Sequence, residues 1–428
     1  MTPERIILGE GVALNVIECN KFKTNCIAIR FLCPLTEDIA SLNALLPFVL
    51  KRGCRRLPSM TEMEKEFDML YGTEIRAAVG KTGDTQFFGF TAHPLCDSYA
   101  EGNKITDSVL SLMSELLYDP NLDENGNINS ECIEVEKRVL ADKVRETINN
   151  KAKYSLQRCS EEMGKNDPSS IPATGSIEQI DAITPEDLTK TLKTALEQYQ
   201  IEIWCAGSFD KDELITSCRR LFVNDKRMTC GSTSLNRIAD AESVLRITEE
   251  QPVKQGKLCV GFTTDVLPDD NDAPILNLFL EIFSNSPVSK LFSNVREKLS
   301  LCYYCSAVPN TAKGTIIVAS GIENENANTA EKAILRELEC CVNADITDDE
   351  MEAAKLALLT SSKSIYDDYG SLISWYFAQQ LYRKKQYSPE EYASLAVNAS
   401  KEDVARVASS LKLHTVYLLK GTAKEDVE

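Results

Sequence analysis

Residues Thr184–Thr189 read Thr-Pro-Glu-Asp-Leu-Thr, and residues Ser400–Ala405, which lie 216 positions further along the chain, read Ser-Lys-Glu-Asp-Val-Ala. Each stretch begins with a hydroxyl residue that can cap a helix, and each leads into a helical pattern followed by a strand pattern. At the same offset, Glu134-Val-Glu136 corresponds to Glu350-Met-Glu352, and both triplets stand at the start of a long predicted helix. Two matches at one offset predict a tandem duplication of one domain.

The duplicated domain is predicted to belong to the α+β class. In each half, short runs typical of strands are interspersed with helical stripes, which favours a mostly antiparallel sheet packed with helices. Residues 224–252 are polar and contain few large apolar side chains before Val244. We therefore expect an N-terminal domain over residues 1–225, a linker over 226–245 and a C-terminal domain over 246–428.

Composition and charge argue against several classes of partner. Asp and Glu outnumber Lys and Arg by 65 to 47, which gives a net charge of −18. Nucleic-acid phosphates and anionic membrane surfaces both require concentrated positive charge, so we expect neither as a partner. The sequence contains no run of about 18 apolar residues and shows no signal peptide at its start, so we expect no membrane span and a cytoplasmic location.

The fifteen cysteines are scattered and lie mostly within apolar runs. Cysteines in that setting usually behave as small buried hydrophobic residues, and a disulfide framework is not expected in a chain of this length, which fits a reducing cytoplasm. The pairs Cys302/Cys305 and Cys340/Cys341 could suggest a metal site. Cys302-x-x-Cys305 lies in a strand pattern, however, where the two side chains are expected to point to opposite faces, so we expect no zinc there.

Only two histidines occur, and both stand at predicted strand ends, His93 before Pro94 and His414 at the start of the last strand. So few histidines nearly exclude a Ser-His-Asp triad, a histidine-rich metal site and any motif that needs two histidines close together. Any catalytic or binding site in this chain is therefore expected to use residue types other than histidine.

The segment Ser289–Tyr303 contains the residues that suggest a function. It begins as an amphipathic helix and continues through a Leu-Ser break into a strand-like run. Arg296 near the helix end and Tyr303 at the start of the strand are hydrogen-bond donors that can hold a peptide carbonyl or a developing oxyanion. Taken singly, Arg296 is typical of a helix surface and Tyr303 of a strand core, so the functional interpretation depends on the whole segment.

The tandem plan and the segment Ser289–Tyr303 together resemble the pitrilysin/insulinase family of inverzincin metallopeptidases, whose half-length members include bacterial and mitochondrial processing peptidases. The resemblance covers essentially the whole chain. In that family the Arg and Tyr of this segment hold the substrate beside the zinc ion, so the resemblance implies substrate binding by Arg296 and Tyr303. Ser300 departs from the pattern, since active relatives more often have glycine there.

The family's catalytic motif, His-x-x-Glu-His on a helix, supplies two zinc ligands and the general base. The corresponding positions here are Ala44 and Phe48 for the histidines and Pro47 for the glutamate, and none of these side chains can bind zinc or move a proton. The family's third ligand, a downstream glutamate, matches Glu134, which we interpret as a structural residue of a helix surface. We therefore expect no catalytic residue, no metal and no other cofactor in this chain.

The resemblance to the family's non-catalytic subunits leads to our first hypothesis, a catalytically inactive subunit of a heteromeric peptidase. Such a chain would bind extended peptide and supply Arg296 and Tyr303 to a zinc-bearing paralogue of similar length. A second hypothesis is a scaffolding protein that kept the fold and lost the chemistry. A third, a self-sufficient zinc peptidase, needs a site rebuilt from scattered Asp, Glu and Cys ligands. The substrate, the partner's identity and a homodimer of the isolated chain stay open.

Overall fold

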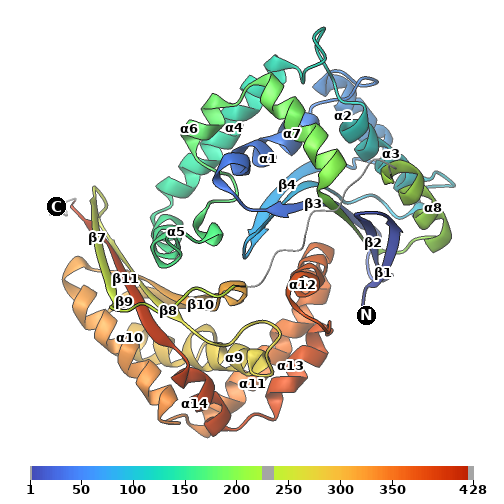
Figure 1. Cartoon of the computed structure of the whole chain (residues 1–428). Helices are drawn as coiled ribbons and strands as arrows, with labels where there is room; N and C mark the ends of the chain where they lie inside the picture. The colour runs from blue at the N-terminus through green and yellow to red at the C-terminus, as the bar shows by residue number, and fades with distance from the viewer. Residues whose placement is uncertain (1, 224–235, 423–428) are drawn as a thin grey trace, which may run out of the picture. The chain divides into compact units, whose positions relative to one another are not determined.

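The computed structural model describes residues 2–223 and 236–422, which divide into two compact units (Figure 1). Among the described residues, the first unit comprises 2–145, 171–223 and 369–376, and the second comprises 146–170, 236–368 and 377–422. Of the linker predicted at 226–245, residues 226–235 lie outside the described part of the chain. None of the described helices is both long and apolar enough to cross a membrane.

A six-stranded sheet forms the centre of the first unit. Its strands are β1 (Glu4–Gly9), β2 (Val12–Glu18), β3 (Cys26–Pro34), β4 (Ile75–Thr82), β5 (Thr85–Ala92) and β6 (Gln200–Gly207). They lie in the order β1-β2-β6-β3-β5-β4, and neighbours are antiparallel except β2 and β6, which are parallel. β4 and β1 are therefore the two edges of this sheet.

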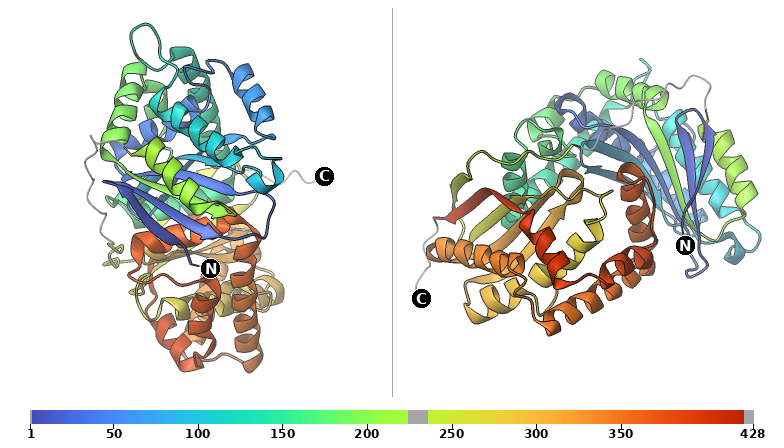
Figure 2. Two further views of the ribbon diagram at one scale, coloured as in Figure 1. Left: turned by 90° about the vertical axis from the view of Figure 1, so that its right-hand side faces the viewer. Right: turned by 60° about the horizontal axis from the view of Figure 1, so that its bottom comes forward.

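The helices of the first unit lie beside this sheet (Figures 1 and 2), and they share one apolar core with it. In the core, the rings of Phe31 on β3 and Phe88 on β5 stack with their centres 5.4 Å apart. Each helix contributes buried apolar residues on one side, as its sequence pattern predicts. The helices are α1 (Glu37–Leu50), α2 (Met60–Met69), α3 (Ile105–Tyr118), α4 (Ser130–Asn149), α6 (Ile177–Ala182), α7 (Pro185–Gln198) and α8 (Lys211–Phe222).

The second unit repeats this plan. Its strands are β7 (Leu245–Gln251), β8 (Gly256–Thr263), β9 (Cys302–Asn310), β10 (Thr315–Ile322) and β11 (Lys412–Gly421). Their order, β7-β11-β8-β10-β9, includes one parallel pair, β7 with β11, and is otherwise antiparallel. It reproduces the order β2-β6-β3-β5-β4 of the first sheet, so the predicted α+β class with two similar domains is confirmed.

The helices of the second unit also follow the repeat. They are α9 (Ala273–Leu280), α10 (Ala327–Val342), α11 (Asp348–Ser364), α13 (Pro389–Val397) and α14 (Lys401–Ser409), together with the π-helical segments η3 (Glu281–Asn285) and η4 (Leu291–Lys298). The two repeated stretches are helix starts, as predicted. Thr184 caps α7 and Ser400 caps α14, and each exchanges hydrogen bonds with an aspartate three residues later.

The two units exchange segments. Helix α5 (Lys151–Met163) comes from the first half of the sequence but packs on the second sheet, against β8, β10 and β11 (Figure 1). The approach is close, because a Cβ atom at Gly261 of β8 would lie 2.4 Å from Met163 Sδ. Conversely, the start of α12 (Tyr369–Tyr382) belongs to the first unit, where the Tyr369 hydroxyl donates to the Cys19 carbonyl at 3.0 Å. The predicted boundaries did not include this exchange.

Polar groups fix the exchanged segment to the second unit. The hydroxyls of Tyr154 and Tyr417 donate to the two carboxylate oxygens of Glu249, at 2.8 and 2.7 Å. Beyond α5, the buried ammonium of Lys313 donates to Asp167 at 2.9 Å. Burial raises the pKa of Asp167, but hydrogen bonds and the charge of Lys313 outweigh burial and hold that pKa below its ordinary value. The ion pair therefore stabilises the folded second unit at neutral pH.

We expect Lys313→Met to lower the free energy of unfolding by about 3 kcal/mol at pH 7, because it leaves a partly buried carboxylate without its cation. The folded pKa of Asp167 lies below the unfolded value of about 3.9, so the contribution of the pair is complete above that pH and is lost as the pH falls. Urea unfolding at pH 7 and at lower pH measures both effects.

Lys384→Met is the matched control, since the Lys384 side chain is 94% exposed beside Asp269. It should leave the free energy of unfolding unchanged. A Lys313→Met variant as stable as the wild type at pH 7 would contradict this account of how the exchanged segment is held.

Candidate functional site

Helix α1 carries the three motif positions Ala44, Pro47 and Phe48, and the structure places all three in the interior of the first unit. α1 continues through Pro47 and ends at Leu50, so the proline neither starts nor breaks the helix. Ala44 and Phe48, one helical turn apart, contribute to the apolar core. These side chains offer no lone pair for a metal and no group that accepts a proton.

The glutamate of helix α4 that points toward α1 is Glu136. The family resemblance identifies Glu134 as the position of the third ligand. The Glu134 side chain is 61% exposed and pairs with Lys137 at 3.0 Å. Glu136 is only 4% exposed, and one of its oxygens accepts a hydrogen bond at 2.8 Å from Arg52, just beyond the end of α1. Its other oxygen has no hydrogen-bond partner among the described residues. The structural role of Glu134 stays a prediction, and Glu136 is the buried carboxylate of this region.

Positive charges surround these groups. Lys143 lies two helical turns after Glu136, on the same side of α4, and its ammonium is 4.2 Å from the centre of the Phe48 ring. The ammonium of Lys51 is 5.7 Å from the same ring. Burial lowers the pKa of Arg52, but the hydrogen bond and charge of Glu136 outweigh burial and raise that pKa above its ordinary value. The buried carboxylate of Glu136 is thus already paired with a guanidinium.

The residues at this position do not fit a zinc ion. A catalytic zinc needs three protein ligands with available lone pairs, and cations nearby oppose its binding. The described residues contain no group of three or more His, Cys, Asp or Glu side chains arranged to hold a metal. The first unit therefore offers no catalytic metal chemistry at the family's motif.

Arg296 and Tyr303 lie at the surface of the second unit, on either side of the turn that leads from η4 into β9. The Arg296 side chain is 41% exposed, 4.7 Å from the centre of the Phe292 ring and 3.5 Å from Glu297. Tyr303 is 61% exposed, and its hydroxyl donates to Glu323 at 2.6 Å. Both donors are accessible, and their role in peptide binding stays a prediction.

The turn before β9 holds Ser300 in a strained backbone conformation. Ser300 has φ of 50°, in the left-handed region that side chains disfavour. Its hydroxyl is within 3.4 Å of the Glu297 carbonyl, a long hydrogen bond that compensates little. Serine therefore occupies a backbone conformation for which glycine is better suited.

A β-bulge sets the side-chain directions at the start of β9. The register with β10 shifts by one residue between Gly321 and Ile322, so Tyr303 has no residue opposite it. The extra residue interrupts the regular alternation of side chains, so Cys302 and Cys305 both face the helix-covered core. The expectation that they point to opposite faces is therefore wrong, because regular alternation does not hold across a bulge.

β9 is an edge strand of the second sheet, since β10 is its one neighbour in the strand order of the described residues. Tyr303, Ser306 and Val308 are exposed along it. The outer backbone groups of such an edge can pair with an extended peptide, which then adds a strand to the sheet. Tyr303 stands at the beginning of this edge, and Arg296 lies on η4, which precedes β9 in the sequence.

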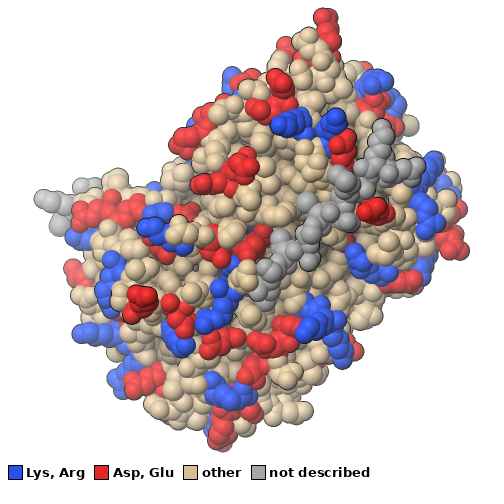
Figure 3. All heavy atoms as spheres, in the orientation of Figure 1, with Lys and Arg blue, Asp and Glu red and all other residues tan. Residues whose placement is uncertain are grey.

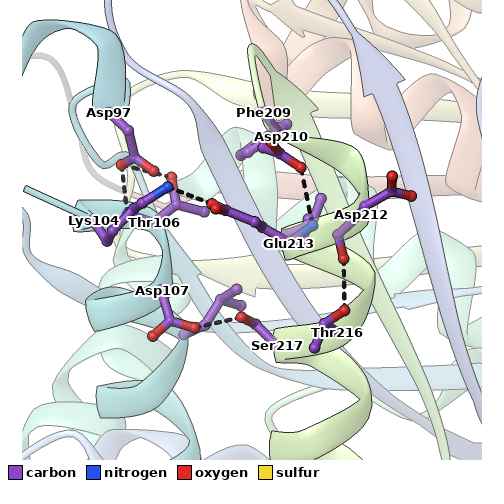
Figure 4. Close-up of a pocket in the computed structure, with 12 residues that line it drawn as sticks. Asp97, Lys104, Thr106, Asp107, Phe209, Asp210, Asp212, Glu213, Thr216 and Ser217 are labelled. Atoms are coloured by element: carbon purple, nitrogen blue, oxygen red, sulfur yellow. Dashed lines mark hydrogen bonds and ion pairs between the residues drawn. The ribbon is translucent and has the colours of Figure 1, made fainter. Parts of the chain in front are cut away.

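A pocket of about 430 Å³ lies between α3 and α8 in the first unit (Figure 4). Four of its five acidic side chains already accept hydrogen bonds within the protein. Asp97 accepts hydrogen bonds from the backbone and hydroxyl of Thr106, and Glu213 pairs with Lys104 across the pocket. The arrangement is explained by the contacts between these helices, so we assign the pocket no function.

Comparison with known proteins identifies the family. Residues 182–358 match the family model described as "Peptidase M16 inactive domain". Over 414 residues, which are 96% of each chain, the sequence is 31% identical to the "Probable inactive metalloprotease YmfF" of Bacillus subtilis (strain 168). The chain belongs to the M16 peptidase family. With Ala44, Pro47 and Phe48 at the motif positions, this M16 chain is a catalytically inactive peptidase homologue, and the predicted family is confirmed.

Other relatives agree with this M16 assignment. An "Uncharacterized zinc protease" of Rickettsia felis is 20% identical over 408 residues, 92% of this chain and 94% of that protein. The crystal structure of a conserved protein from Enterococcus faecalis V583 matches over 100% of both chains, with a TM-score of 0.91 and 24% identity. A peptidase M16 inactive domain from Pseudomonas fluorescens matches with a TM-score of 0.76 and 16% identity, over 99% of this chain and 100% of that one. These structures share the fold.

Glu134 and Glu136 of α4 provide a matched test of the site. We expect Glu136→Gln to lower the free energy of unfolding by about 1–3 kcal/mol, because it weakens a buried charged hydrogen bond to Arg52. Glu134→Gln should change it little, since that side chain is mostly exposed. Urea unfolding of both variants measures the difference, and a larger effect of Glu134→Gln would contradict the inward placement of Glu136.

The strained turn gives a second test. We expect Ser300→Gly to raise the free energy of unfolding by about 0.5–1 kcal/mol, because glycine adopts a positive φ without steric cost. Ser306→Gly, on the exposed and extended part of β9, is the control and should destabilise the protein. Thermal unfolding of the two variants distinguishes them, and a loss of stability in Ser300→Gly would refute the claim of strain.

Proposed function

We propose that this M16 chain is the non-catalytic subunit of a heteromeric peptidase, in which it binds extended peptide beside the active site of a zinc-bearing paralogue. One contrast supports the proposal. The motif helix α1 carries core residues and no ligand, whereas Arg296 on η4 and Tyr303 at the start of the edge strand β9 are exposed. Loss of the metal site combined with accessible donors favours substrate binding without catalysis.

The two donors suit an extended peptide chain. Outer backbone groups of β9 can pair with the peptide main chain, which gives binding that does not depend on its sequence. Ala307, whose N–H already donates to Ser284 Oγ, and Pro309, which has no N–H, cannot donate in this pairing. The Arg296 guanidinium and the Tyr303 hydroxyl can each donate to a peptide carbonyl oxygen. If the paralogue attacks that carbonyl, the same donors stabilise the negative charge that develops on the oxygen. The zinc ion and the general base would come from the paralogue.

The relatives and the surface charge fit this proposal. The Bacillus subtilis relative is described as a probable inactive metalloprotease, and the Rickettsia felis relative as a zinc protease, so inactive and zinc-dependent descriptions both occur among proteins of this length. On the face drawn in Figure 3, Lys and Arg side chains are interspersed with Asp and Glu. Such a mixed surface suits a protein or peptide partner better than a nucleic acid.

One observation favours scaffolding as the second candidate function. Tyr303 already donates a 2.6 Å hydrogen bond to Glu323, and Arg296 already contacts Phe292 and Glu297. A peptide would have to compete with these contacts. In a scaffolding protein the same residues would only shape the turn into β9.

We expect the chain to raise the peptidase activity of its zinc-bearing paralogue when the two are purified as a complex. Arg296→Ala and Tyr303→Phe should each reduce this gain by about 10- to 100-fold, because each removes one donor to the developing oxyanion. Cleavage of extended peptides by the complex, with kcat and KM measured separately, tests this. Metal analysis should find zinc in the complex and none in this chain alone.

Arg145→Ala and Tyr99→Phe are matched controls, since both side chains are exposed in the first unit. They should leave the gain unchanged. Full activity of both Arg296 and Tyr303 variants in an intact complex would support scaffolding instead. About one zinc ion per isolated chain would refute the assignment of the metal to the partner.

A further inference from the structure

Two cysteines meet at the bulge in β9. Cys302 and Cys305 are reduced thiols, and the extra residue at Tyr303 brings both onto the same face of the strand. They pair across the sheet with Ile322 and Ser320, which are two positions apart. Adjacent positions on one face of a strand are separated by about 6.6 Å. That separation lies at the upper end of the Cα separations that disulfides bridge, about 4.4–6.8 Å.

The two thiols differ in pKa because their surroundings differ. A hydrogen bond from Cys305 lowers the pKa of Cys302, and the positive charge of Arg296 adds to this, so that together they outweigh burial. The interaction with Cys302 and burial both raise the pKa of Cys305 well above its ordinary value. Cys302 is therefore the thiol that ionises first, and Cys305 is the protonated neighbour.

We propose that Cys302 and Cys305 form an oxidisable dithiol, which hydrogen peroxide converts to a disulfide. The Cys302 thiolate attacks one peroxide oxygen, the O–O bond breaks, and the second oxygen leaves as hydroxide and takes up a proton to become water. The sulfenic acid at Cys302 is then attacked by the sulfur of Cys305, which forms the S–S bond and releases a second water. Two thiols and one peroxide thus give one disulfide and two waters.

The disulfide would close a ring that contains Tyr303. The bulge directs Tyr303 outward between the two thiols, so oxidation would fix the local backbone that presents its side chain. The ring would also remove the thiolate that faces Arg296. The dithiol assignment itself does not depend on the function proposed above, because it is detected without any peptidase assay.

One tryptic peptide reports on the pair. Residues 299–313, between Lys298 and Lys313, contain Cys302 and Cys305 and no other cysteine. After treatment of the full chain with hydrogen peroxide and blocking of free thiols, we expect this peptide to lose two hydrogens and to resist the blocking reagent. A thiol reductant should restore both thiols.

Cys340 and Cys341 provide an internal control, since they are also two cysteines in one tryptic peptide, residues 337–355. Burial raises the pKa of Cys340, and it raises the pKa of Cys341 to about 12, so neither thiol is activated. We expect the Cys302–Cys305 disulfide to form at least about tenfold faster than any oxidation of this control pair. Equal rates, or oxidation of the control pair first, would overturn the proposal.

Single variants test the assigned roles. Cys305→Ser should leave Cys302 able to form a sulfenic acid that persists or is oxidised further, while Cys302→Ser should leave Cys305 unreactive. Arg296→Gln should slow disulfide formation several-fold without preventing it, because the positive charge beside Cys302 is lost. Circular dichroism checks that each variant is folded. Recovery of Cys302 in the wild type as sulfinic acid with Cys305 still reduced would refute the dithiol.

Discussion

The central strands β8, β10 and β11 of the second sheet are covered on both faces, and the rest of the architecture follows from how the second face is covered. One face packs against α9, α10, α11 and α14 in a single core. The other is covered by α5, whose Cys159 and Met163 pack with apolar residues of β8, β10 and β11. A sheet with two apolar faces needs a helical layer on each. Because α5 comes from the first half of the sequence, the second unit cannot complete its core from residues 246–428 alone.

The exchange shows which parts of the fold local sequence can predict. The capping boxes at Thr184 and Ser400 involve residues three positions apart, so their chemistry is visible in the sequence and was predicted correctly. The amphipathic pattern of α5 indicates only that one side is buried. It does not say which sheet receives that side. The decisive contact, Met163 over Gly261, joins residues far apart in the chain, and no local pattern encodes it.

The inward position of Glu136 on α4 could have been predicted from the sequence. Ile133 and Leu140 are fully buried and seven residues apart, which marks one side of the helix. Glu136 lies between them at helical spacing and shares that side, whereas Glu134 does not. Periodicity alone thus favours Glu136 as the inward carboxylate. Its partner Arg52 lies far from it in the sequence, beyond the end of α1, and could be placed only by the structure.

The bulge at Tyr303 determines both the exposure of the Tyr303 side chain and the position of the thiols of Cys302 and Cys305. In a regular strand, Cys302 and Cys305 would lie on opposite faces, and Tyr303 would share a face with Cys305. One unpaired residue reverses both relationships, since it places the two thiols together in the core and directs Tyr303 outward. A bulge of one residue leaves the apolar composition of the strand unchanged. Counting apolar positions in the sequence therefore does not reveal the bulge. The same backbone irregularity therefore sets the exposure of the candidate peptide donor and the contact between the thiols behind it.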